Sequence, residues 1–152
     1  MVIFMRIIIK GIFLIVLGFV IGHFIFGTKI DIINKLSKKD SFYFLQQGIY
    51  TNSYSLKNNT KHLTNKIIDK SNNKYYVYVA ITKDKDIADK IIKIYKNKGI
   101  SLIKKEKYLK SKEFSNSVDQ FDILVKDTNE EDEIITIEEV ILENYKEIVK
   151  KE

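Results

Sequence analysis

The sequence predicts an α+β domain with the element order βαββαβ, in which a four-stranded antiparallel sheet carries both helices on one face. Two observations support this prediction. The segments 43–50 (YFLQQGIY) and 75–82 (YYVYVAIT) are both rich in the aromatic and β-branched residues that favour strands. Each segment is followed by a polar turn and then by helix-like periodicity. The chain therefore contains two strand–helix units in tandem.

Before these units, residues 1–28 are predicted to form a single membrane-spanning helix. Residues 7–26 are apolar apart from one lysine and one histidine, and about 20 apolar residues in a helix cross the hydrocarbon core of a bilayer. A cleaved signal peptide is the alternative, but residues 22–28 (GHFIFGT) match a small-x-small cleavage site poorly. We therefore expect an uncleaved anchor, followed by a tether at residues 29–41.

The predicted domain covers residues 42–106, and its first half contains a strand, a helix, a short strand and a turn. The helix is expected to start at Asn52 and Ser53, which are good N-terminal residues. The turn is expected at the two asparagines of SNNK, because asparagine tolerates the left-handed backbone conformation. The four elements are, in order, 42–51, 54–66, 67–70 and 71–74.

The second half of the domain begins with the clearest strand of the chain, residues 75–82. Asp84 and Asp86 then lie where a helix N-terminus favours acidic side chains. The helix runs to Lys98 with apolar residues at 3.6-residue spacing, and Gly99 is a natural helix stop. The last strand is predicted at residues 100–106.

Strand alternation divides the two central strands, the first and the third, between two faces of the sheet. The side chains expected to face the helices are Leu45, Tyr75, Val77 and Val79. The side chains expected to project from the other, uncovered face are Phe44, Gln46, Tyr76 and Tyr78. The sequence therefore predicts three aromatic rings and one amide on an open surface.

Residues 107–152 form a C-terminal extension with two predicted amphipathic helices. The apolar stripe of the first is Phe114, Val118, Phe121 and Val125, and that of the second is Ile134, Ile137, Ile141, Tyr145 and Ile148. Helices of this length need a packing partner, because isolated ones are marginal in water. We expect them to extend the core elsewhere and to leave the open face free. If they covered that face, it could not bind a ligand.

The charge of the chain is distributed unevenly. Residues 29–112 hold 20 lysines and 7 acidic residues, whereas residues 113–152 hold 4 lysines and 13 acidic residues. A basic middle followed by an acidic end indicates a polyanionic partner, internal pairing, or simply a solvated surface.

The composition excludes several kinds of catalytic site. The chain has no cysteine and only two histidines, so it contains neither a thiolate nucleophile nor a His/Cys metal cluster. No glycine-rich phosphate loop is present. We therefore expect a binding protein that is not an enzyme and has no cofactor or metal.

The segment FLQQGIY at residues 44–50 resembles the opening signature of SPOR domains, V-Q-V-G-x-F. The matching positions are Leu45, Gln46, Gly48 and Tyr50. Residues 76–99 are similar to the second strand–helix unit of that family, including its helix alanine at Ala88. The family's second glycine is replaced by Ala80. The resemblance covers residues 42–106 and leaves out the tether and the C-terminal extension.

This resemblance implies an RNP/ferredoxin-like fold and a function. SPOR domains bind the glycan strands of septal peptidoglycan, often from a single N-terminal anchor outside the cytoplasm. Gln46 lies at the position of the family's glycan-associated glutamine, and Phe44, Tyr76 and Tyr78 would stack on sugar rings. The expected protein is therefore a single-pass protein of the cell membrane whose extracytoplasmic domain localises it to sites of division or sporulation.

Two alternatives remain open at the level of sequence. RNA-recognition modules also carry rings on strands 1 and 3, but their glycine- and aromatic-rich signature is missing from residues 75–82. The other alternative is a membrane-tethered scaffold that binds a protein partner through residues 113–152. The lysines after the predicted span favour a cytoplasmic domain, which conflicts with the resemblance. We follow the resemblance, because lysine is abundant throughout the chain.

Overall fold

The computed structural model describes residues 40–149. They belong to the second of two compact units, Ser37–Glu152. The predicted anchor (1–28) and nearly all of the tether (29–41) lie outside the described residues. Between residues 40 and 149, every helix is too short or too polar to span a membrane.

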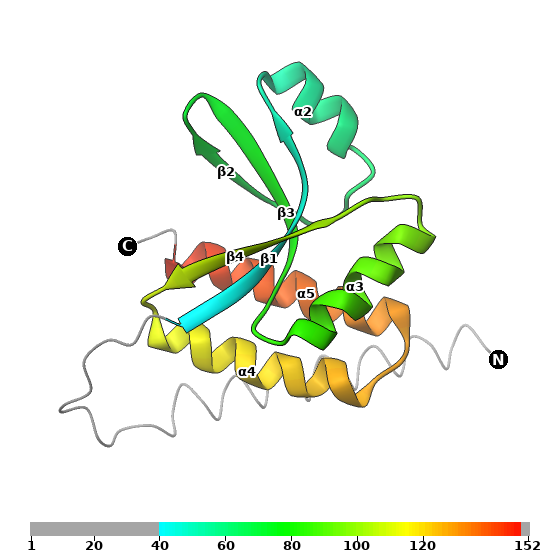
Figure 1. Cartoon of the computed structure of the whole chain (residues 1–152), viewed down its shortest axis with the longest axis vertical. Coiled ribbons are helices and arrows are strands. Elements are labelled where there is room, and N and C mark those ends of the chain that lie inside the picture. The colour runs from blue at the N-terminus through cyan, green and yellow to red at the C-terminus, as the bar shows by residue number, and fades with distance from the viewer. Residues whose placement is uncertain (1–39, 150–152) are drawn as a thin grey trace. The chain divides into compact units, whose positions relative to one another are not determined.

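The described residues form an α+β fold around a four-stranded sheet (Figure 1). The strand order is β2-β3-β1-β4 and every neighbouring pair is antiparallel, as predicted. The elements are β1 (Asp40–Tyr50), α2 (Ser53–Thr60), β2 (Ile67–Ser71), β3 (Lys74–Thr82), α3 (Lys85–Asn97), β4 (Ile103–Leu109), α4 (Lys112–Asp127), α5 (Glu131–Asn144) and the π-helical turn η1 (Tyr145–Val149).

The local signals of the sequence place the turns and caps correctly. Asn72 and Asn73 have φ values of 50° and 57°, the left-handed conformation that a tight hairpin between β2 and β3 requires. The side chain of Asp84 accepts hydrogen bonds from two N–H groups in the first turn of α3. Gly99, with φ of 77°, follows the end of the same helix.

Three predicted boundaries are wrong by several residues. Helix α2 ends at Thr60 instead of residue 66, and the ammonium group of Lys66 donates to the carbonyls of Thr60 and Leu63 beyond its end. Strand β4 starts at Ile103 instead of residue 100, because the N–H of Ile100 completes the C-terminal cap of α3 by donating to Tyr95. It ends at Leu109 instead of residue 106, because it pairs with β1 as far as Asp40.

The pairing of β1 with β3 contains an irregularity that decides which side chains share a face. Leu45 pairs with Ala80, Gln46 with Tyr78 and Gly48 with Val77. Val79 on β3 and Gln47 on β1 therefore have no partner in this strand pair. Such a bulge reverses the alternation beyond it. We call the side of the sheet that carries Phe44 the ring face. The opposite side is the α3 face, where Lys104 beside Leu45 reaches Asp89 of α3.

Helices α4 and α5 and the turn η1 pack against the ring face. The ring of Phe114 lies 5.4 Å from that of Phe42, and the ring of Tyr145 lies 5.4 Å from that of Phe44. The expectation that the C-terminal extension would leave this face open is therefore wrong. The two apolar stripes must be buried, and the ring face is the large apolar surface that they cover. Their stripe residues are buried, except for half-buried Ile148.

Candidate functional site

The four residues predicted to bind glycan share one face of the sheet, but the face is covered. Phe44 is 0% exposed, and Gln46 and Tyr78 are each 4% exposed. Tyr76 alone is half-buried, near the edge of the covered area. The prediction that these side chains project into solvent is corrected for Phe44, Gln46 and Tyr78, because the C-terminal helices pack on them.

The rings of the covered face already hold a cation from the same chain. The ammonium nitrogen of Lys107 lies 4.0 Å from the ring centre of Tyr78 and 4.5 Å from that of Phe44. It also forms an ion pair with Asp69 at 3.2 Å. A sugar could stack on these rings only after this cation and the helices had moved away.

Two buried carboxylates fix the C-terminal helices to the end of β3. Strand β2 begins at Ile67, opposite Tyr78, so the last residues of β3 have no strand on that side. Glu138 of α5 accepts a hydrogen bond from the N–H of Ile81 at 3.1 Å. Asp122 of α4 accepts one from the N–H of Lys83 at 3.0 Å and one from the hydroxyl of Thr82 at 2.7 Å.

The surroundings of both carboxylates favour the protonated form. Burial raises the pKa of Glu138 well above its usual value, although the hydrogen bond from Ile81 acts in the opposite direction. Burial also raises the pKa of Asp122, against the hydrogen bonds from Thr82 and Lys83. The second oxygen of Glu138, Oε1, is buried and has no hydrogen-bond partner among residues 40–149. Burying these two carboxyl groups between the C-terminal helices and β3 therefore lowers the stability of the fold.

This cost predicts a stabilising substitution. Because the pKa of Glu138 is raised in the folded protein, the free energy of unfolding falls as the pH rises from the unfolded-state pKa toward the folded-state pKa. Glu138→Gln keeps an acceptor for Ile81 and removes the ionisable group. We expect it to raise the free energy of unfolding by about 1–3 kcal/mol at pH 8 and to have little effect near pH 4.

Urea unfolding at several pH values, followed by circular dichroism, measures this effect. The control is Glu147→Gln, which removes an exposed carboxylate of η1 and should change stability by less than about 0.5 kcal/mol at every pH. A Glu138→Gln variant that is equally destabilised at pH 4 and pH 8 would contradict the assignment.

The bulge creates a second aromatic surface, on the α3 face. Tyr50 pairs with Tyr75, which pairs in turn with Lys70 on β2. The Tyr50 hydroxyl donates to the side-chain oxygen of Gln47 at 2.8 Å. The Tyr50 ring lies over Gly48, where an added Cβ would be 2.8 Å from the hydroxyl oxygen. We call Gln47, Tyr50, Lys70 and Tyr75 the tyrosine platform.

The tyrosine platform is accessible and basic. Both tyrosines are half-buried, and the Lys70 ammonium nitrogen lies 5.4 Å from the ring centre of Tyr75. Figure 1 shows that the β2–β3 hairpin and α2 extend away from α4 and α5. We call residues 47–78, which contain the end of β1, α2, β2 and the start of β3, the outer half of the domain. Simple alternation does not predict this surface, and the only trace in the sequence is Gly48, because a glycine inside a strand is typical of a bulge.

Within residues 40–149, no group of three or more His, Cys, Asp or Glu side chains could hold a metal ion. Comparisons of the chain with protein-family models, with curated proteins and with solved structures found no match. The resemblance to SPOR domains therefore stays a prediction.

Proposed function

We propose that the domain is a non-catalytic module that binds the glycan strands of peptidoglycan, and that it does so at the tyrosine platform. The observation that supports this proposal is the pair of partly exposed rings of Tyr50 and Tyr75 on neighbouring strands, with the amide of Gln47 beside them. Aromatic faces stack on the apolar sides of sugar rings, and an amide can donate and accept hydrogen bonds with hydroxyl and acetamido groups.

The fold and the motif residues agree with this proposal. The βαββαβ order and the strand order β2-β3-β1-β4 support an RNP/ferredoxin-like domain with α2 and α3 on one face. Two positions of the SPOR-like motif, Gly48 and Tyr50, build the platform, since the glycine leaves room for the ring. If residues 1–28 are an anchor and the orientation is that of the SPOR proteins the chain resembles, the domain lies outside the cytoplasm and holds the protein at sites of division or sporulation.

The two alternatives have less support. RNA-recognition modules use the rings of strands 1 and 3, and the corresponding rings here, Phe44 and Tyr78, are buried. A protein scaffold that docks through the acidic helices of residues 113–152 would have only their exposed side chains to use, because their apolar stripes are buried against the sheet. The exposed remainder of α4 and α5 is mainly acidic and polar.

Sedimentation with purified peptidoglycan tests the proposal. We expect the double substitution Tyr50→Ala and Tyr75→Ala to weaken binding about tenfold, because each stacked ring contributes roughly 0.5–1.5 kcal/mol. The control is Tyr108→Ala, since Tyr108 is a 61% exposed tyrosine on β4, outside the platform. Unchanged sedimentation of a folded double variant would refute the platform as the glycan site.

A further inference from the structure

The outer half carries exposed lysines that form no ion pair among the described residues. Residues 47–78 contain five lysines and one acidic residue. That residue, Asp69, pairs with Lys107 on the ring face. Lys66 donates to backbone carbonyls. Among the described residues, no ion pair involves the four remaining lysines, which are exposed: Lys57, Lys61, Lys70 and Lys74.

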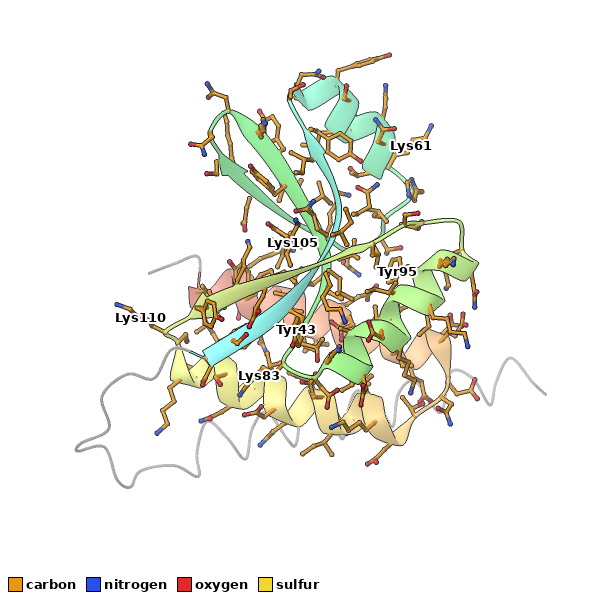
Figure 2. All side chains as sticks on the ribbon, in the orientation of Figure 1. Tyr43, Lys61, Lys83, Tyr95, Lys105 and Lys110 are labelled. Atoms are coloured by element: carbon orange, nitrogen blue, oxygen red, sulfur yellow. The ribbon has the colours of Figure 1, made fainter. Side chains whose placement is uncertain are left out.

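Elsewhere in the domain, several lysines are neutralised by nearby acids. Lys83 pairs with Asp119 at 2.7 Å and Lys104 pairs with Asp89 at 2.6 Å. The acidic residues of the domain are concentrated in its C-terminal helices, since residues 112–149 hold three lysines and twelve acidic residues. Figure 2 shows Lys61 at the end of α2, in the outer half. With five lysines and one acidic residue, the outer half itself is basic.

One of the unpaired lysines, Lys70, lies at the tyrosine platform, and the other three lie elsewhere in the outer half. Lys70 lies directly across the strand pair from Tyr75, whereas Lys74, the first residue of β3, precedes that tyrosine in the strand and lies on the opposite face. Lys57 and Lys61 are four residues apart, which places them on one side of α2 and its C-cap. A ligand that stacks on the two tyrosines therefore meets Lys70 directly, an extended ligand can reach the other lysines of the outer half, and within residues 47–78 it meets no unpaired carboxylate.

From this arrangement we infer that the ligand is a polyanion, namely wall glycan that carries covalently attached phosphodiester polymer. The inference rests on the proposed function and specifies its substrate class. The sugar rings contact Tyr50 and Tyr75, and the phosphates contact the four lysines. A phosphodiester carries one negative charge per repeat at neutral pH, so a polymer of such units can engage separated lysines together.

The experiment compares the full chain on two preparations of cell-wall sacculi. One preparation keeps its phosphodiester polymers, and the other has lost them through hydrofluoric acid treatment. The test variant replaces Lys57, Lys61, Lys70 and Lys74 by glutamine. The control variant makes the same change in net charge at four exposed lysines outside the outer half: Lys93, Lys96, Lys98 and Lys112.

We expect wild type to bind the untreated sacculi at least tenfold more tightly than the treated ones, and to lose this preference in high salt. The test variant should lose the preference at low salt as well, while the control variant stays within twofold of wild type. Equal binding of wild type to both preparations overturns the inference, and so does an equal loss in the test and control variants. Tighter binding to a single-stranded oligonucleotide than to untreated sacculi also overturns it, in favour of nucleic acid.

The inference and the proposed function fail separately. If wild type binds both preparations equally and the Tyr50→Ala, Tyr75→Ala variant binds neither, the platform binds neutral glycan and only the inference is lost. If the tyrosine variant binds treated sacculi as well as wild type does, the proposed function fails, whatever the lysines contribute.

Discussion

Replacing Phe44 by alanine is expected to lower the free energy of unfolding by about 3–5 kcal/mol. The side chain is fully buried and forms edge-to-face contacts with Tyr78 at 5.3 Å and with Tyr145 at 5.4 Å. The ammonium group of Lys107 also lies over its ring. A small domain is stable by only about 5–15 kcal/mol, so the variant should unfold at a much lower urea concentration, as followed by circular dichroism.

The matched control is Tyr54→Ala, which removes an aromatic ring that is 76% exposed on α2. Its effect on the same unfolding curve should stay within about 0.5 kcal/mol. The opposite result for Phe44, unchanged stability with loss of glycan binding, would mean that the ring face is open in solution and that the sequence-based site is correct after all.

Ending the chain after Lys110 is expected to abolish cooperative folding. This truncation removes α4, α5 and η1, and it exposes the rings of Phe42, Phe44 and Tyr78, each worth roughly 1.5–3 kcal/mol when buried. It also removes the carboxylates that accept from the backbone of β3. Thermal unfolding should then lose its sharp transition, and the chain should bind a hydrophobic dye.

Adding residues 111–152 back as a separate polypeptide is expected to restore the sharp transition. A truncated chain that unfolds sharply on its own would show that the C-terminal helices are not part of the core. If such a chain also bound glycan through Phe44 and Tyr78, the helices would act as a removable cover on the predicted site.

Much of the fold follows from signals between residues that are close in the sequence. The asparagine pair at 72–73, the capping Asp84 and the terminating Gly99 each act on a neighbouring turn or helix end. The strands and the two C-terminal helices follow from the period of their apolar residues. These features do not depend on how distant segments dock, so sequence alone predicts them.

The site could not be predicted in the same way, because it depends on docking and on one local irregularity. The periodicity of α4 and α5 shows that they bury a stripe, but it does not say which surface they bury it against. They bury it on Phe44 and Tyr78, which leaves no open ring face. Because of the bulge near Gln47, the Tyr50 side chain lies on the same face as that of Tyr75. Strict alternation along β1 would place it on the opposite face.

The long-range contacts of the first strand constrain how the protein folds during synthesis. Asp40 in β1 accepts a hydrogen bond from Ser115, 75 residues later in the chain. Ile81, in the neighbouring strand β3, donates one to Glu138, 57 residues later. Contacts that span so much of a chain form late. A ribosome must therefore release almost the entire polypeptide before β1 can be enclosed. Until then the nascent chain displays bare aromatic side chains and an unpaired strand edge, the features that chaperones bind and that drive aggregation.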